Sequence, residues 1–126
     1  MRDFAIHLSH RPGELGRVAN ILGKAGLNIK SVAAMTFGNQ GTVRVIADDV
    51  EAARNALKGA NLPFEESELV TVLLENKAGE LGDVADKLSQ AGINLHAVYV
   101  VGLEGDLVEL ALAVDDLKKA KKILEG

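Results

Sequence analysis

Two stretches of the chain match one another and decide the fold. Residues 11–34 read RPGELGRVANILGKAGLNIKSVAA, and residues 77–100, which lie 66 positions later, read KAGELGDVADKLSQAGINLHAVYV. Eleven of the 24 aligned positions are identical without a gap. A match of this kind at a fixed spacing indicates that the chain consists of two copies of one structural unit. We therefore expect a first repeat over residues 1–67 and a second over residues 68–126.

Each copy has the pattern of a small unit of four strands and two helices. Apolar residues alternate over residues 4–8, which predicts a strand with one buried face. After Pro12-Gly13 they recur at helical spacing as far as Gly26, where the helix is expected to stop. The remaining expected elements are strands over 29–37 and 42–47, a helix capped by Asp48 or Asp49, and a strand over 63–67. The predicted fold class is α+β, with two ferredoxin-like βαββαβ units, each an antiparallel sheet with its helices on one face.

The second copy differs from the first in length. After Leu124 it has two residues, where the first copy has residues 61–68, so the second unit is expected to lack a fourth strand. The strand over residues 69–75 should then have an open edge, which residues 63–67 or another chain would cover. The Asp-Asp pair of the first copy also returns one residue late, which places an extra residue in the turn around Glu104 and Gly105.

Composition and charge exclude several classes of function. Fourteen basic residues against eighteen acidic ones give a net charge of −4, which argues against binding to nucleic acid. The absence of cysteine excludes disulfides, thiolate nucleophiles and cysteine zinc sites. No apolar run is long enough to cross a membrane, and no secretion signal is present, so a cytoplasmic protein is expected. We find no set of acid and base residues for catalysis and expect no enzyme activity, metal or cofactor.

Two features of each copy suggest a site for a small zwitterion. Gly13 and Gly79 stand where a strand turns into a helix, and the first N–H groups of that helix would form a receptor for a carboxylate. Asn28 and Asn94 open the second strand of each copy, and an amide can bind both an amino group and a carboxylate oxygen. The alternative is that the glycines only make a tight turn and the asparagines only tolerate an unusual backbone conformation.

This arrangement of motifs resembles the ACT domain. The resemblance rests on R-P-G-E-L at the first strand–helix turn and G-L-N-I at the start of the second strand, repeated as K-A-G-E-L and G-I-N-L. It covers essentially the whole chain. ACT domains are small regulatory modules that bind amino acids, and they occur in phosphoglycerate dehydrogenase, in regulatory subunits of acetolactate synthase and in free-standing tandem proteins.

The resemblance implies a particular set of binding residues. In the serine-binding ACT domain the turn reads H-E-N-R-P-G-x-L and is followed by G-V-N-I, and the asparagine of each motif contacts the ligand, the second one from the neighbouring domain. The implied residues in the first copy are His10, Arg11, Pro12, Gly13, Glu14, Leu15 and Asn28, and in the second copy Asn76, Lys77, Ala78, Gly79, Glu80, Leu81 and Asn94. One site is expected to combine residues 10–15 with Asn94, and its twin residues 76–81 with Asn28. The twin that keeps Asn76 is favoured.

The expected function is binding of a small amino acid as an allosteric or sensory ligand, held between the two repeats. The alternative is an interaction or regulatory subunit that binds no ligand and acts on a separate metabolic enzyme, such as a biosynthetic one. A homodimer is also expected. Regular strand alternation would gather Leu73, Val98, Val100, Ala111 and Ala113 on the face of the second sheet that carries no helices, and such a patch usually marks an interface. A bulge that shifts the alternation by one residue would break this patch up.

Overall fold

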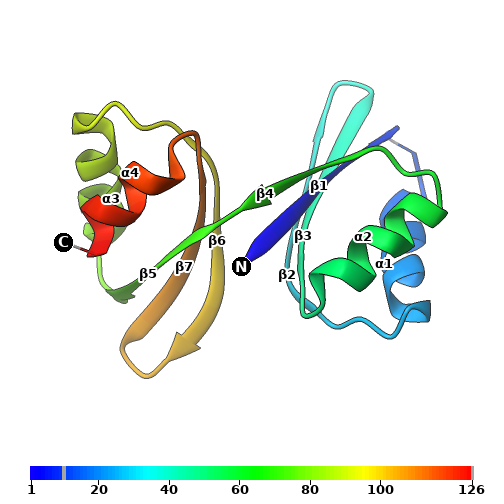
Figure 1. Cartoon of the computed structure of the whole chain (residues 1–126), viewed down its shortest axis with the longest axis horizontal. Coiled ribbons are helices and arrows are strands. Elements are labelled where there is room, and N and C mark those ends of the chain that lie inside the picture. Colours follow the sequence, from blue (N-terminus) through cyan, green and yellow to red (C-terminus); the bar gives the residue numbers. More distant parts are fainter. Residues whose placement is uncertain (10, 126) are drawn as a thin grey trace. The chain divides into compact units, whose positions relative to one another are not determined.

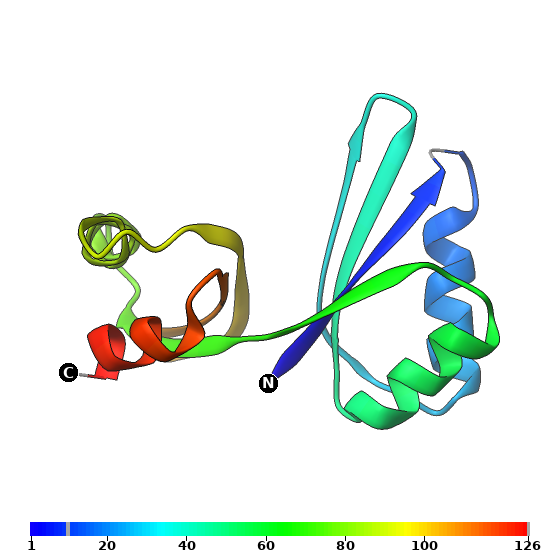
Figure 2. The same cartoon turned by 45° about the horizontal axis from the view of Figure 1, so that its top comes forward.

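The structure is a computed structural model and describes residues 1–9 and 11–125. The chain divides into two compact units, one formed by Arg2–Ser67 and the other by Glu68–Gly126 together with Met1. In each unit the helices lie on one face of the sheet (Figures 1 and 2). Within the described ranges, no helix has the length and apolar character needed to cross a membrane.

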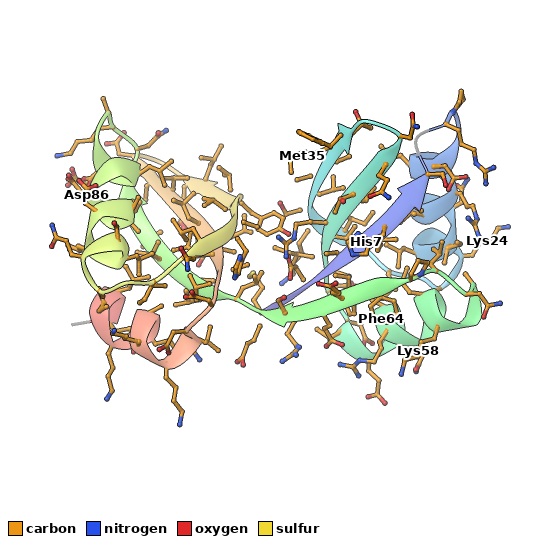
Figure 3. The ribbon with its side chains drawn as sticks, turned by 90° about the horizontal axis from the view of Figure 1, so that it is seen from above. His7, Lys24, Met35, Lys58, Phe64 and Asp86 are labelled. Atoms are coloured by element: carbon orange, nitrogen blue, oxygen red, sulfur yellow. The ribbon has the colours of Figure 1, made fainter. Side chains whose placement is uncertain are left out.

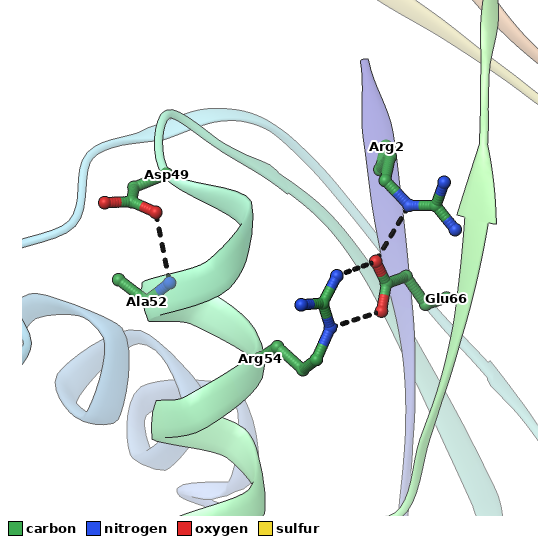
Figure 4. Close-up of polar contacts among 5 residues, drawn as sticks. All are labelled: Arg2, Asp49, Ala52, Arg54 and Glu66. Atoms are coloured by element: carbon green, nitrogen blue, oxygen red, sulfur yellow. Dashed lines mark hydrogen bonds and ion pairs between the residues drawn. The ribbon is translucent and has the colours of Figure 1, made fainter.

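The first unit has the complete βαββαβ order. Its elements are β1 (Arg2–Ser9), α1 (Glu14–Lys24), β2 (Ile29–Phe37), β3 (Gln40–Ala47), α2 (Val50–Gly59) and β4 (Phe64–Glu68). The strand order in the sheet is β2-β3-β1-β4, and β3 pairs antiparallel with both β1 and β2. Of the two aspartates expected before α2, Asp49 is the cap, because its Oδ1 accepts a hydrogen bond from the Ala52 N–H at 3.1 Å (Figure 4). The predicted order of elements is confirmed for this unit.

The apolar residues of β1 pack under the helices as the alternation predicts. Phe4 and Ile6 are 1% and 0% exposed, and they belong to the same buried cluster as Val18 and Leu22 of α1. The ring of Phe4 also meets Phe64 of β4 edge-on, with the ring centroids 5.6 Å apart. These contacts join β4 to β1, its neighbour in the sheet.

A charged cluster ties β4 to β1 and α2 (Figure 4). Arg54 of α2 donates two hydrogen bonds to the carboxylate of Glu66, from Nε at 2.8 Å and from Nη2 at 2.6 Å. Arg2 of β1 donates a third from Nε at 2.8 Å. The hydrogen bonds from Arg54 lower the pKa of Glu66 most, those from Arg2 add to the effect, and together they bring it to about 2.

The described residues of the second unit form five elements. They are β5 (Val70–Glu75), α3 (Glu80–Gln90), β6 (Leu95–Glu104), β7 (Leu107–Val114) and α4 (Leu117–Glu125). The sheet has the order β5-β7-β6, with both ladders antiparallel. Leu88, Leu112 and Ala120 are fully buried at the centre of its core. The missing fourth strand is therefore confirmed within the residues that the structure describes.

The segment 63–67 does not cover the open edge of β5, so that part of the prediction is wrong. β4 neighbours β1 in the first sheet, and its approach is fixed by the His7 N–H, which donates to the Pro63 carbonyl at 3.1 Å. The chain passes from β4 to β5 through Leu69 alone. In the described part of the chain, β7 is the one strand that pairs with β5.

A bulge interrupts β6 shortly after it begins. Leu95 pairs with Val114 and Ala97 pairs with Ala113, so that His96 is an additional residue on its strand. The first repeat has the same irregularity between Ile29 and Ser31 of β2. Each bulge shifts the alternation of side chains by one residue for the rest of the strand.

This shift overturns the predicted apolar patch. Val98 pairs with Leu112 and Val100 with Leu110, and both leucines lie in the core on the helix side of the sheet. Val98 and Val100 therefore belong to the helix side and do not join Leu73 on the opposite face. In the first repeat, Val32 and Ala34 move to the helix side in the same way, since they pair with the core residues Val45 and Val43.

The one extra residue of the second repeat is Val101. The pairing of β6 with β7 shifts a second time between Val100 and Gly102. In both hairpins two residues remain unpaired at the turn, so the turns have equal length. The expectation of an extra residue around Glu104 and Gly105 is therefore wrong.

Candidate functional site

The turn between the first strand and the first helix has the same backbone in both repeats. Gly13 precedes α1 with φ 90°, and Gly79 precedes α3 with φ 92°; both are left-handed conformations that favour glycine. Among the described residues, no side chain caps either helix. The first N–H groups of α1 can therefore receive an anionic group of a ligand, whereas at α3 the Glu80 N–H donates to the Lys77 carbonyl at 3.5 Å.

Charge differs between the two turns. In the first, the side chain of Glu14 is 13% exposed and lies between two arginines, with Arg11 Nε at 2.9 Å and Arg17 Nη1 at 3.6 Å. Two guanidinium groups thus outweigh one carboxylate, and Glu14 does not oppose an anion at this helix. In the second turn, one lysine forms ion pairs with two carboxylates, so the carboxylates outnumber the cation: Lys77 Nζ lies 2.9 Å from Glu75 and 3.8 Å from Glu80.

A groove of about 270 Å³ lies beside the first turn. Its walls come from β1, β2, β3 and the start of α1, and they are mostly apolar. The lining residues are Leu8, Ser9, Arg11, Glu14, Leu15, Ala34, Met35, Thr36, Gly41, Thr42 and Val43. The volume is below the range of pockets that hold drug-sized molecules, which suits a smaller ligand.

The sequence did not point to the strand residues of this groove. Ala34 and Thr36 of β2, with Val43 of β3, lie on the helix side of the sheet and line the groove, whereas the side of the sheet that Met35 (labelled in Figure 3) shares with Thr42 is the opposite one. Ala34 and Val43 come together because they pair across the hairpin. The two-residue turn between Phe37 and Gln40 sets that register, but no local motif shows that this hairpin lies beside the turn at Gly13.

The strand-opening asparagines have structural partners within their own units. Asn94 donates to Asp115 from its side-chain Nδ2 at 2.8 Å and from its backbone N–H at 3.0 Å. The hydrogen bond from the side chain and then that from the backbone lower the pKa of Asp115. In the first repeat the backbone N–H of Asn28 donates to Asp48 Oδ1 at 3.3 Å. Each contact fastens the start of the second strand to the end of the third.

Within a single unit the two parts of the expected site lie apart. α1 has 11 residues, about 16 Å of helix, and it separates the turn from the strand that Asn28 opens. The structure therefore does not bring Asn28 to residues 11–15, and the equivalent helix α3 separates Asn94 from residues 77–81.

The remaining candidate residues lie on the surface of the turns. Leu15 and Leu81 are 49% and 50% exposed. Pro12, Ala78 and the two turn glycines are exposed as well. Asn76 is exposed, and its backbone N–H donates to the Asp106 carbonyl at 2.7 Å. His10 lies outside the described residues.

Two consecutive βαββαβ-type units, each with an uncapped helix at its first turn, define the chain as a pair of ACT-like modules. It belongs to the ACT domain pair family, whose family model matches residues 1–125. The resemblance inferred from the sequence is confirmed. A comparison with curated proteins finds no match.

Solved structures share the fold over nearly the whole chain. The protein BT0572 from Bacteroides thetaiotaomicron has 22% sequence identity and a TM-score of 0.86, over 98% of this chain and 85% of that one. The regulatory subunit of aspartate kinase from Thermus thermophilus, in its ligand-free form, has 10% identity and a TM-score of 0.68, over 98% and 90%. The corresponding subunit from Thermus flavus has 14% identity and a TM-score of 0.67, over 98% and 88%.

Proposed function

We propose that this protein is a non-catalytic regulatory protein that binds a small amino acid. The observation that carries the proposal is the first turn, where an uncapped helix flanked by two arginines opens beside an apolar groove. Membership of the ACT domain pair family supports it, as does the shared fold with regulatory subunits of aspartate kinase.

Each part of an amino acid has a matching group near this turn. The carboxylate binds to the N–H groups that follow Gly13, next to the guanidinium of Arg11. The side chain enters the groove, whose apolar wall favours a small aliphatic group. The ammonium needs an acceptor, which an asparagine side-chain oxygen supplies.

The asparagine must come from another copy of the repeat, because a helix separates the two parts within one unit. We therefore assign residues 10–15 to a site with Asn94, and residues 76–81 to a second site with Asn28. In Asn94 the Nδ2 group already donates to Asp115, so Oδ1 is the atom that accepts from the ammonium. The cationic balance favours the first of these sites for a carboxylate, whereas Asn76 favours the second.

A thermal-shift screen against the twenty amino acids tests the proposal. A ligand present at 100 times its dissociation constant is expected to add about 2.7 kcal/mol to the free energy of unfolding. We expect one or a few chemically related small amino acids to raise the melting temperature and the others to leave it unchanged. A flat response to all twenty would contradict the proposal.

Calorimetry on variants tests which residues form the sites. Arg11→Gln is expected to weaken the site of the first turn, and Asn76→Ala and Asn28→Ala the site of the second. Loss of a hydrogen bond to a charged group costs about 1.5–3 kcal/mol, or about ten- to a hundred-fold in affinity. If Asn76→Ala and Asn28→Ala both leave stoichiometry and affinity unchanged, the second site is wrongly assigned.

A second candidate function is a subunit that binds no ligand and acts on a separate metabolic enzyme. Two large apolar side chains on one face of the β2–β3 hairpin favour it, since Met35 is 66% exposed and Phe37 is 93% exposed. Residues of this kind are enriched where proteins contact partners. The thermal-shift screen separates the two candidates, because this one predicts no response to amino acids.

A further inference from the structure

One edge of β5 carries backbone groups that no strand pairs within the described residues. β5 lies at the end of the order β5-β7-β6, with its other edge against β7. In the first unit β4 covers the equivalent edge of β1. An exposed edge of this kind is a template for pairing with another strand.

The direction of the N–H groups shows which residues are available there. The Leu69 N–H donates to the Met1 carbonyl at 2.8 Å, and the Asn76 N–H donates to Asp106 in the turn between β6 and β7 at 2.7 Å. Backbone groups point alternately to the two edges of a strand. Even-numbered residues of β5 therefore face β7, and Thr71, Leu73 and Glu75 face the open edge.

We propose that the open edge of β5 pairs antiparallel with β5 of a second copy of this chain, with the two-fold axis at Leu73. This pairing makes one continuous sheet from two second units, and it does not depend on the proposed ligand function. In an antiparallel pair about a two-fold axis, opposite residues lie on the same face of the sheet. Leu73 then faces Leu73 of the copy, and Thr71 faces Glu75 of the copy.

Met1 selects this register. It already occupies the edge opposite Leu69, so a partner strand must end before that position. With Leu73 on the axis, the last strand residue of the copy, Glu75, lies opposite Thr71, and the chain then turns toward its helix α3. If the two-fold axis lay at Val72 instead, Glu75 of the copy would lie opposite Leu69, in the position that Met1 occupies.

The proposed contact also suits the side chains. Leu73 is 60% exposed in the single chain and becomes covered by its own copy. The carboxylate of Glu75 comes beside the hydroxyl of Thr71 in the copy, so a hydrogen-bond donor and an acceptor meet at each end of the pair.

Single cysteines in this cysteine-free chain test the register. Opposite residues in a hydrogen-bonded antiparallel pair have Cα atoms about 5.5 Å apart, within the range of a disulfide. We expect Leu73→Cys to give a disulfide-linked dimer under mild oxidation. Thr71→Cys is the matched control, since it lies on the same strand and face but about 13 Å from its counterpart, and we expect it to stay unlinked.

Solution mass gives the second readout. Light scattering on the unmodified chain at micromolar concentration is expected to report two chains, and Leu73→Lys is expected to report one while keeping its circular dichroism spectrum. A mass of one chain for the unmodified protein overturns the proposal. So does a folded Leu73→Cys that stays unlinked, or equal linking of Thr71→Cys.

A strand added in front of Met1 provides a competitor. Because Met1 lies opposite Leu69, four to six preceding residues such as alternating Val and Thr would run along Thr71 and Leu73 of the same chain. We expect this fusion to convert the dimer to a monomer, and a Gly-Ser extension of the same length at the same place to leave it dimeric. A dimer that survives the N-terminal fusion shows that another surface joins the chains and contradicts the proposal.

Discussion

Leu88→Ala is expected to lower the free energy of unfolding by about 2–5 kcal/mol and to unfold the second unit first. Leu88 is 0% exposed and packs in one cluster with Leu112 and Ala120. The loss combines the removed apolar contact with the cavity that remains. The described residues of the second unit form a sheet of three strands, and small units have little stability in reserve to offset such a cavity.

Denaturant unfolding measures this effect, and amide hydrogen exchange localises it. Exchange in β5, α3 and β7 is expected to accelerate more than exchange in β1 and β3. Leu81→Ala is the matched control, because it is the same substitution on the same helix at a residue 50% exposed, and it is expected to change stability by about 0.5 kcal/mol or less. Equal losses for the two variants would show that Leu88 does not pack as described.

The periodic signals of the sequence predicted the elements of the fold well. Residues 4–8 alternate in a strand whose inward side is buried, and the apolar residues after Gly13 follow one face of α1. Because the sequence repeats, the same strands and helices were predicted for the second copy. This spacing of apolar residues follows from the geometry of a single helix or strand, so the sequence alone is enough to predict it.

The face of the edge strands could not be predicted in this way. Regular alternation from Asn28 onward would put Val32 on the outer side, but the bulge after Ile29 turns it to the helix side. The bulge after Leu95 did the same to Val98. A bulge forms where a strand pairs with its neighbour in the folded sheet. The sequences around the two bulges, in β2 and β6, do not differ visibly from those of regular strands.

One part of the candidate site could be predicted from the sequence and another part could not. The turn at Gly13 was visible because glycine at a strand–helix junction is a local signal, and the structure places it at φ 90°. The groove wall of Ala34 and Val43 depends on how the β2–β3 hairpin lies against the turn at Gly13, which no local motif encodes. The expected meeting of a turn with Asn28 or Asn94 needs a second repeat, so it stays a prediction.

Glu66→Gln is expected to destabilise the first unit by about 1.5–3 kcal/mol at neutral pH, the usual range for hydrogen bonds to a charged group. The carboxylate of Glu66 is 16% exposed and accepts from Arg54 and Arg2, so it joins β4 to α2 and β1. The variant leaves two guanidinium groups beside a neutral amide. Glu65→Gln is the control, because Glu65 is the next residue on the strand and its side chain is 81% exposed.

The same carboxylate predicts how stability depends on pH. The pKa of Glu66 is about 2 in the folded chain and near its ordinary value of 4.5 when unfolded. A lowered pKa contributes stability that is fully present above the unfolded value and is lost as the pH falls toward the folded value. The first unit is therefore expected to lose stability between about pH 4.5 and 2, and Glu66→Gln should lose less over that range. Unfolding in denaturant, followed at several pH values from 7 to 2 through amide signals of β1 and β4, tests this prediction. If the stability of the unmodified chain and of Glu66→Gln falls equally with pH, the prediction is contradicted.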